Sequence, residues 1–299
     1  MKRFLICIYL AVLLIFGSIG GAFAAHYIDG MEPTSDMVDL QKGFTVRMYN
    51  SFYTADTYKD NDGNSIGNVD VNKYLMTLRG YYMTNWELLG AKYGFSMGVP
   101  IGYNRLTIGF MPENDNFNFG DIYFEPIIFK WSGSRYDIVA SGGVYIPTGD
   151  YKANDPTSVG YGYWGGLISV GGNYYFDDMQ TIFATGTVRY EINSESRDTN
   201  WQPGDIFHTE YALIKRFELG ETDRLNIGIG GYTKVQVSND SGVSPLFNPN
   251  KAFVTAVGPS ISYDVAPWGL SIGLKGYWEF FAKNQPEGMN FMLTIAQKF

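Results

Sequence analysis

The last dozen residues of the chain alternate in hydrophobicity and end on an aromatic side chain. Counting back by twos from Phe299, one face carries Ile295, Leu293 and Phe291, and Gln297 is its one polar member. Successive side chains of a β-strand point to opposite faces, so this segment predicts a strand with one apolar face. A final strand of this kind is typical of bacterial outer-membrane β-barrels.

The first 24 residues predict an export signal. Lys2 and Arg3 precede the apolar run Phe4–Phe16, and Ala22–Ala24 forms a small-residue cleavage site. The run is shorter than the roughly 18 residues of a spanning helix, which favours a signal peptide over a membrane anchor. A cut after Ala24 removes Cys7, the only cysteine, so we expect no disulfide or thiolate site in the mature chain.

Charge and composition narrow the function classes. The chain carries 22 basic and 30 acidic residues, and loss of Lys2 and Arg3 leaves 20 against 30, a net charge of −10. With no basic cluster, nucleic acid is not an expected partner. After the signal, no run approaches 18 consecutive apolar residues, so a membrane would have to be crossed by strands. The 23 Tyr, 21 Phe and 36 Gly residues suit strands, tight turns and aromatic girdles.

Twelve segments have strand-like patterns, and each exceeds the roughly 9 residues that cross a bilayer at a tilt. They are Gly43–Thr54, Val69–Met83, Leu88–Val99, Phe119–Trp131, Tyr136–Pro147, Tyr161–Phe176, Gln180–Asn193, Gly204–Phe217, Arg224–Ser238, Lys251–Val265, Trp268–Ala282 and Gly288–Phe299. The connections alternate between long and short, which is the loop pattern of an outer-membrane barrel. The third connection contains Tyr103–Phe110, a possible extra short strand.

Alternation also predicts which side chains face the lumen. In Trp268–Ala282, the odd positions Ser271, Lys275, Tyr277, Glu279 and Lys283 oppose an apolar even face. Because charge is costly on the lipid side, we expect the polar face inward. The candidate residues for a lumen or substrate path are Arg79, Tyr145, Arg189, Glu191, Glu210, Lys234, Lys275, Tyr277 and Glu279. These charges could instead pair with one another and fill a narrow lumen.

Three other motifs partly resemble a catalytic site, a calcium loop and a nucleotide-binding loop. His208 shares a face with Glu210, and no Ser–His–acid arrangement follows from its spacing, so we expect a hydrogen-bonded lumen histidine. Asp60–Asn64 lacks the glycine and the final glutamate of a calcium loop, and a polar turn is favoured. Gly228–Gly231 lies within a strand rather than before a helix, so a nucleotide loop is excluded. We therefore expect no catalytic residue, metal or cofactor.

The chain resembles the outer-membrane transporter family named for the meta-pathway of phenol degradation. The resemblance rests on short pieces in order: Phe52–Asp56, Asp62–Asn64, Tyr93–Phe95, Gly120–Ile122 with Pro126, Pro147–Tyr151, Gly204-Asp205, Asn239–Gly242, Gly258-Pro259 and Pro286–Gly288. It implies a barrel associated with uptake of aromatic or other hydrophobic compounds. The tract Trp201–Asp205 departs from the family pattern.

Together these features predict an all-β, transmembrane antiparallel barrel of about twelve strands in the bacterial outer membrane, and not an enzyme. The expected divisions are a signal peptide (1–24), an N-terminal segment that forms a plug or a periplasmic tail (25–42), and the barrel (43–299). The expected function is passive uptake of small hydrophobic or aromatic solutes. The expected partners are lipid, the solute and the assembly machinery, which would read the strand ending at Phe299. The alternatives are a structural or adhesive barrel with a closed lumen and a general diffusion porin.

Overall fold

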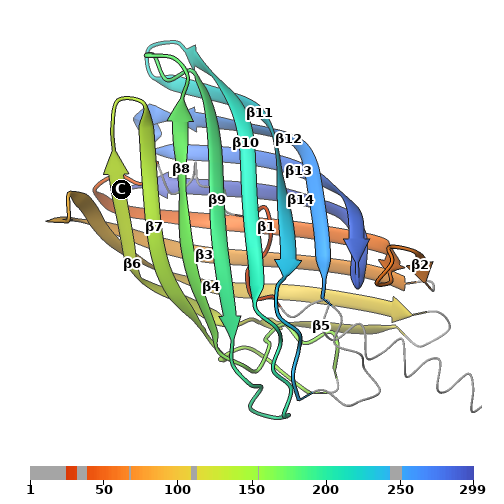
Figure 1. Cartoon of the computed structure of the whole chain (residues 1–299). Helices are drawn as coiled ribbons and strands as arrows, with labels where there is room; N and C mark the ends of the chain where they lie inside the picture. The colour runs from red at the N-terminus through yellow and green to blue at the C-terminus, as the bar shows by residue number, and fades with distance from the viewer. Residues whose placement is uncertain (1–24, 32–38, 67–68, 109–112, 154, 243–250) are drawn as a thin grey trace, which may run out of the picture.

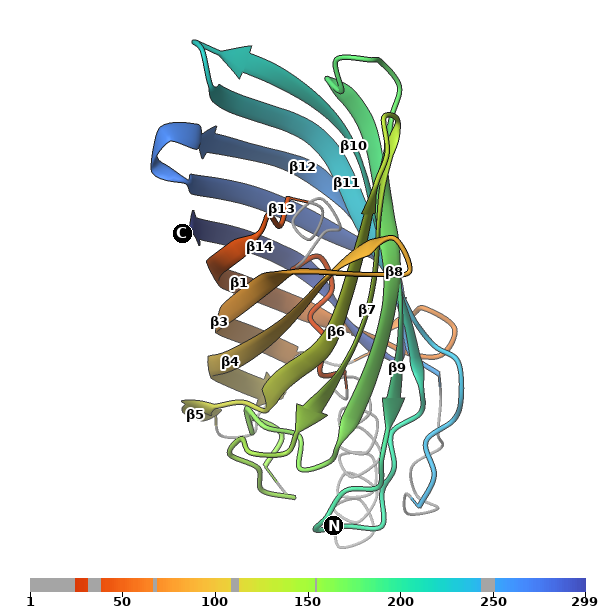
Figure 2. The same ribbon diagram turned by 90° about the vertical axis from the view of Figure 1, so that its left-hand side faces the viewer.

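The computed structural model describes residues 25–31, 39–66, 69–108, 113–153, 155–242 and 251–299, and the predicted signal peptide lies outside these ranges. Of the fourteen strands in one antiparallel sheet, twelve form the barrel wall (Figures 1 and 2). The wall strands are β1 (Gly43–Lys59), β3 (Val69–Leu88), β4 (Ala91–Ile108), β6 (Ile122–Ser132), β7 (Tyr136–Ile146), β8 (Gly165–Tyr175), β9 (Ile182–Asn193), β10 (Ile206–Leu219), β11 (Asp223–Gln236), β12 (Phe253–Val265), β13 (Leu270–Lys283) and β14 (Gln285–Lys298). The short strands β2 (Ser65–Ile66) and β5 (Asn114–Phe119) pair with β1 and β4.

The sheet closes because its last strand pairs with its first. The β1–β14 register runs from Thr45 opposite Lys298 to Lys59 opposite Gln285. Each remaining wall strand pairs with its neighbours along the chain, so the backbone hydrogen bonds of the wall are satisfied within the sheet. Closure of twelve wall strands confirms the predicted fold class.

The two faces of the wall differ as the alternation predicted. On β13, Ile272 and Leu274 point outward and are 41% and 53% exposed, whereas Tyr277 points inward and is buried. Lys283 was expected on the inward face and is exposed instead. Phe281 has a left-handed φ of 58°, and the register with β12 shifts near this point. This irregularity reverses the alternation, so Ala282 is buried and Lys283 faces out.

The prediction of an extra strand at Tyr103–Phe110 is wrong. This segment, as far as Ile108, is the end of β4, which continues through Pro100 and stays paired with β3 as far as Val69 opposite Ile108. The added short strand is β5, which follows in the chain. A proline is tolerated in β4 because Pro100 lies where its other neighbour changes from β5 to β6.

Short turns and long connections lie at opposite rims of the barrel. We call the rim that carries the β3–β4, β8–β9 and β12–β13 turns the short-turn rim, and the opposite one the long-loop rim. The β3–β4 turn has Leu89 and Gly90 at positive φ, and the β12–β13 turn is the 3₁₀ helix η1 (Ala266–Trp268). Among the described residues, no helix has the length and hydrophobicity needed to cross a membrane.

The β8–β9 turn depends on one carboxylate. Asp177 accepts hydrogen bonds from the backbone N–H groups of Thr181 and Ile182 and from the Thr181 hydroxyl. The hydrogen bonds from the Ile182 and Thr181 groups hold the pKa of Asp177 below its usual value. A lowered folded-state pKa adds stability at neutral pH that is lost as the pH falls.

We therefore expect Asp177→Ala to lower the urea midpoint for unfolding at pH 7, and to lower it much less at pH 3. Asp178→Ala is the control, because the Asp178 carboxylate instead makes an exposed ion pair with Arg135, and such pairs contribute little. Equal losses at both pH values would contradict the role given to the Asp177 carboxylate.

Candidate functional site in the barrel lumen

The N-terminal segment 25–31 lies inside the barrel (Figure 2). His26 N and Tyr27 N donate to the two oxygens of Glu191 on β9, at 2.9 and 3.2 Å. Further along the segment, Gly30 N donates to Glu210 on β10 at 2.7 Å. Lys275 Nζ on β13 donates to the Gly30 carbonyl at 2.9 Å. Strands on different sides of the wall thus hold one short stretch of chain in the lumen.

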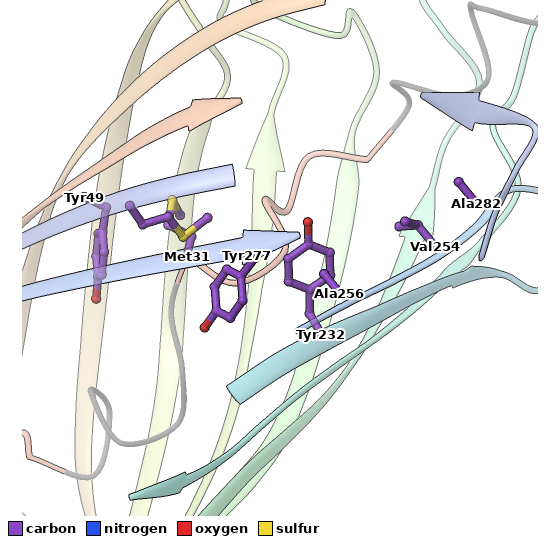
Figure 3. Close-up of a cluster of buried hydrophobic side chains, with 8 residues drawn as sticks. Met31, Tyr49, Tyr232, Val254, Ala256, Tyr277 and Ala282 are labelled. Atoms are coloured by element: carbon purple, nitrogen blue, oxygen red, sulfur yellow. The ribbon is translucent and has the colours of Figure 1, made fainter. Parts of the chain in front are cut away.

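The described N-terminal residues 25–31 and Leu40 contact the wall at different levels of the barrel. His26 lies near Tyr161 and Tyr163, which belong to the connection 147–164 at the long-loop rim. Leu40 is buried toward the short-turn rim, in a cluster with Tyr81 and Ile128, and its carbonyl accepts a hydrogen bond from Lys130 Nζ. In the middle, Met31 packs against Tyr232 and other side chains of the wall (Figure 3).

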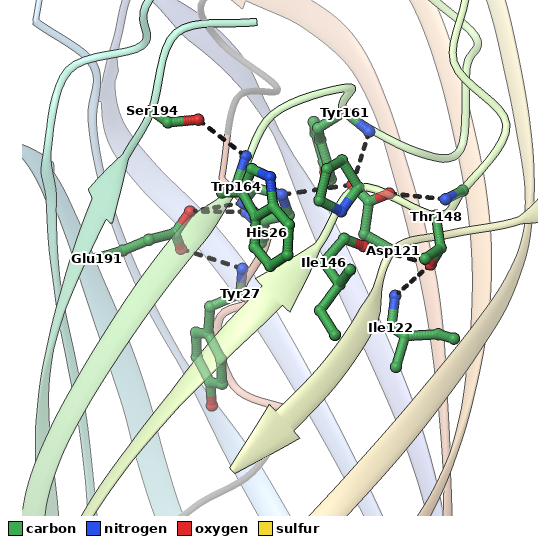
Figure 4. Close-up of polar contacts among 12 residues, drawn as sticks. His26, Tyr27, Asp121, Ile122, Ile146, Thr148, Tyr161, Trp164, Glu191 and Ser194 are labelled. Carbon is green, nitrogen blue, oxygen red and sulfur yellow. Dashed lines mark hydrogen bonds and ion pairs between the residues drawn. The ribbon is translucent and has the colours of Figure 1, made fainter. Parts of the chain in front are cut away.

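Acidic and imidazole groups alternate in a row across the lumen near the long-loop rim, and Figure 4 shows its part from Asp121 through His26 to Glu191. Asp121 is 3.4 Å from His26 Nε2, and Glu191 is 3.2 Å from His26 Nδ1. The other Glu191 oxygen is 3.4 Å from His208 Nε2, and His208 Nδ1 is 2.7 Å from Asp29 Oδ1. We call these five residues the carboxylate–histidine row. Two of its members, His26 and Asp29, belong to the segment, so the row fastens the segment to the wall.

His26 is positively charged at neutral pH. Burial of the ring opposes protonation, but the contacts with Asp121 and Glu191 outweigh it and raise the pKa of His26 to about 9. A charged imidazole between two carboxylates removes the cost of burying unpaired charges.

A second set of contacts surrounds Tyr27. Its hydroxyl donates to Glu210 Oε1 at 2.6 Å, and its ring lies under the Arg189 guanidinium at 4.3 Å. Arg189 is in turn 3.5 Å from Glu210 Oε2. The ion pair on the wall and the aromatic ring of the segment therefore stabilise each other.

Two further groups lie on the wall. Arg79 bonds to Glu125 and Ser96, and its guanidinium lies 4.7 Å from the rings of both Tyr81 and Tyr123. Elsewhere, the Glu279 carboxylate accepts hydrogen bonds from the hydroxyls of Tyr53 and Tyr232, each at 2.8 Å, and from Gly288 N. These contacts are internal pairings of the kind that fills a narrow lumen.

The predicted lumen residues all face inward but serve different partners. Six of them contact the segment or pair with a residue that does: Tyr145, Arg189, Glu191, Glu210, Lys234 and Lys275. Lys234 is 3.9 Å from Asp29. Arg79, Tyr277 and Glu279 lie in the wall groups, with Tyr277 edge-on to Tyr232 at 5.3 Å. His208 is a buried, hydrogen-bonded lumen histidine, as expected.

Sequence reasoning missed the partners of these residues. His26 and Asp29 were not selected because they precede the first strand, and Asp121 entered only as part of a family motif. One feature of the sequence indicates a buried role for this stretch: the polar residues His26 and Asp29 flank Tyr27 and Ile28. Nothing in the sequence pairs His26 with Glu191, which is 165 positions away.

A cavity lies beside the segment. It holds about 650 Å³ of space, part of it open to solvent, and its lining is mainly tyrosine rings and aliphatic side chains. The lining residues are His26, Tyr27, Ile28, Met31, Leu75, Thr77, Arg79, Gly98, Pro100, Gly120, Asp121, Tyr123, Tyr145, Val159, Tyr161 and Leu167.

The wall beside this cavity has a break in its ladder. β4 pairs with β6 as far as Gly98 opposite Tyr123, and with β5 from Ile101 opposite Phe119. Between these points, Gly120 N donates to the Pro100 carbonyl at 2.9 Å. Few backbone hydrogen bonds therefore join β4 to β5 and β6 where the cavity meets the wall.

Asp121 lies next to this break and bonds to the connection 147–164 at the long-loop rim. Its carboxylate accepts hydrogen bonds from Gly149 N and Tyr161 N, both at 2.8 Å. A Cβ on Gly149 or Gly160 would lie within 2.8 Å of backbone atoms, so glycine is needed for this close approach. One carboxylate therefore positions the connection 147–164 and the side chain of His26.

A closed antiparallel barrel with an apolar outer face and a charged lumen is the fold of a bacterial outer-membrane protein. The chain belongs to the family described as "Putative MetA-pathway of phenol degradation", which matches residues 55–295. The fold and the family place the protein in the bacterial outer membrane.

Solved structures support this fold assignment. An outer membrane channel from Pseudomonas putida F1 is similar with a TM-score of 0.72 and 14% identity, over 91% of this chain and 100% of that chain. The β domain of the Bordetella autotransporter BrkA has a TM-score of 0.55 and 10% identity, over 87% of this chain and 100% of that one. The translocator domain of the Neisseria meningitidis autotransporter NalP has a TM-score of 0.50 and 13% identity, over 89% and 92%. Comparison with curated proteins finds no match.

The charge on His26 gives a prediction about pH. A group whose pKa is raised by folding adds stability that is complete below its unfolded pKa of 6.5 and is lost as the pH rises through about 9. The groups that face His26 are Asp121, Glu191, Tyr145, Tyr161 and Tyr163. We expect the segment to be held firmly at pH 7 and to loosen through pH 9.

Residues 25–299 contain no cysteine, so one introduced thiol is a clean reporter. A single thiol at Ile28→Cys should react slowly with a maleimide at pH 7 and faster above pH 9, after correction against an exposed Ser65→Cys thiol. His26→Gln in the Ile28→Cys background should react faster at pH 7 and show a smaller step near pH 9, because His208 still holds Asp29 of the segment. An identical pH profile in both variants would disprove that His26 holds the segment.

Proposed function

We propose that this protein passes small hydrophobic or aromatic compounds passively across the outer membrane. The observation that carries the proposal is the tyrosine-lined cavity, which lies beside the N-terminal segment and against the break in the wall. Apolar cavities with a few polar groups suit small, largely apolar ligands.

The contents of the lumen argue against a general diffusion porin. The segment 25–31 lies in the barrel interior, and its backbone is bonded to Glu191, Glu210 and Lys275 on three strands. In this state the described charged groups of the lumen serve internal pairings rather than a wide aqueous channel. A solute that needs little hydration is therefore a better fit to the cavity than a sugar.

The proposed route begins at the long-loop rim and enters the cavity next to Tyr161 and Val159. From the cavity, a solute could continue past the segment toward the periplasm or leave sideways between β4 and β6. The sideways path is favoured by the local structure, because few ladder hydrogen bonds separate the cavity from the lipid near Pro100 and Gly120.

Relatives agree with this proposal. The similar structure from Pseudomonas putida F1 is described as an outer membrane channel, and the family description refers to phenol degradation. A hydrolase is a poor alternative, since both ring nitrogens of His208 face carboxylates, Asp29 and Glu191, rather than a hydroxyl nucleophile.

The signal peptide, and the role of residues 25–42 as a plug, are parts of the same proposal. Export would remove residues 1–24. The segment 25–31 would then be the N-terminus of the mature chain and would lie in the lumen. The contacts of His26, Tyr27 and Gly30 support a plug rather than a free periplasmic tail.

The test uses residues 25–299 refolded into vesicles that contain lipopolysaccharide, with empty vesicles as the baseline. Entry of a phenol should exceed entry of a sugar of similar size. Gly98→Leu should reduce phenol entry about tenfold, because its side chain fills the cavity. Gly166→Leu is the matched control, since this glycine of β8 follows the inward-facing Gly165 and points the other way.

Removal of residues 25–38 should raise sugar entry and ion conductance by opening the polar lumen. Equal entry of phenol and sugar in the unaltered barrel would instead indicate a general pore. No entry of either solute into vesicles with folded protein would indicate a structural or adhesive barrel.

A further inference from the structure

The imidazole of His26 is enclosed by three tyrosines and two carboxylates. Its ring stacks on Tyr145 with centroids 4.7 Å apart and an interplanar angle of 16°. Tyr161 and Tyr163 approach from other sides, at 4.8 and 4.6 Å. Asp121 and Glu191 complete the enclosure, and Figure 4 shows His26 between them. We call these five residues around His26 the tyrosine–carboxylate cage.

The cage is built by the barrel and not by the segment that fills it. Tyr145 belongs to β7, Glu191 to β9, and Tyr161 and Tyr163 to the connection between β7 and β8, while Asp121 joins β5 to β6. Gly165 leaves room for the occupant, because a Cβ there would lie 2.7 Å from His26 Nδ1. The wall therefore contains a formed receptor, and the segment supplies its ligand.

The chemistry of the cage selects a flat or compact organic cation. The faces of tyrosine rings attract cations, and aromatic cages of this kind hold ammonium groups. Both carboxylates are buried, so a neutral occupant would leave their charge poorly compensated. His26 meets both demands because it is aromatic and, with its pKa raised to about 9, positively charged.

We propose that the tyrosine–carboxylate cage is a binding site for small organic cations of the imidazolium or alkylammonium class, which His26 occupies in the closed barrel. A free cation that takes the cage displaces His26 and frees the outer end of the segment. The site is therefore a ligand-controlled latch on the plug, and it shares Asp121, Tyr145 and Tyr161 with the cavity of the proposed solute route.

Competition with His26 sets the concentration range. A tethered ligand acts at an effective concentration in the millimolar range, so a free cation is expected to compete in the unaltered barrel only at about 100 mM. Removal of the tethered ligand by His26→Ala should reveal the intrinsic affinity.

The direct test is calorimetric titration of the folded barrel with tetramethylammonium and, as a neutral compound of the same shape, tert-butanol. We expect saturable binding of tetramethylammonium to His26→Ala, about tenfold tighter than to the unaltered barrel, and no saturable binding of tert-butanol. Tyr145→Leu added to His26→Ala should weaken the binding. Tyr175→Leu added instead should leave it unchanged, because Tyr175 is a buried tyrosine at the short-turn end of β8, where it packs on Phe183.

Displacement is tested separately in the unaltered barrel that carries only Ile28→Cys. Tetramethylammonium at about 100 mM should accelerate maleimide labelling at pH 7, whereas the same concentration of sodium chloride should not. Equal binding of tetramethylammonium and tert-butanol, or no saturable binding to folded His26→Ala, would overturn the cage as a cation site. Binding to His26→Ala without accelerated labelling in the unaltered barrel would overturn the latch. Phenol transport is not measured in either test, so a failure here leaves the proposed uptake function standing.

Discussion

Closure of the sheet between β1 and β14 is the constraint on which the rest of the structure depends. In hydrocarbon, backbone groups have no water to bond with, so an open sheet edge is not tolerated. The pairing of β1 with β14 from Thr45 to Lys59, with one register shift between Thr54 and Thr57, removes that edge. Closure also fixes the two environments of every strand, since one face must meet lipid and the other must meet the enclosed lumen. The polar face is thereby gathered into a small volume in which charges lie close together.

The polar groups of a narrow lumen need hydrogen-bond partners. In the described residues, other side chains of the lumen supply these partners. Arg79 is paired with Glu125, and Glu279 is bonded to two tyrosine hydroxyls. On the wall, Glu191 faces His208 and Glu210 faces Arg189, and the backbone of the segment supplies further donors to both carboxylates. The segment is thus held by the same electrostatic demand that makes the lumen polar. Its removal would leave buried carboxylates without those bonds.

The strand pattern and the facing of side chains could be predicted from sequence because both depend on a local period of two. Arg189, Glu191 and Lys275 lie on the face that this rule assigns to the lumen, and their place on a solute path stays a prediction. The same rule failed at Lys283, where a bulge reverses the alternation, and at Pro100, where a strand continues through a residue that usually ends one. The links among His26, Asp121 and Glu191 could not be predicted, because they depend on how distant strands are arranged around the closed barrel. The cavity depends on the same arrangement.

The plug and the cavity are coupled through shared residues. His26, Asp121, Tyr145 and Tyr161 line the cavity and also form or fill the cage. A solute in the cavity therefore contacts the groups that hold the outer end of the segment. If the solute binds better when His26 has left the cage, then release of His26 must strengthen solute binding by the same factor, because the coupling between two sites is reciprocal. Lys275 and Glu210 retain the inner part of the segment in either case, so the outer end can move while the rest still fills the lumen. Because the two ends of the segment are held by different residues, movement of His26 can change access to the hydrophobic cavity. The inner part of the segment stays bound, so the barrel does not become an open pore for polar solutes.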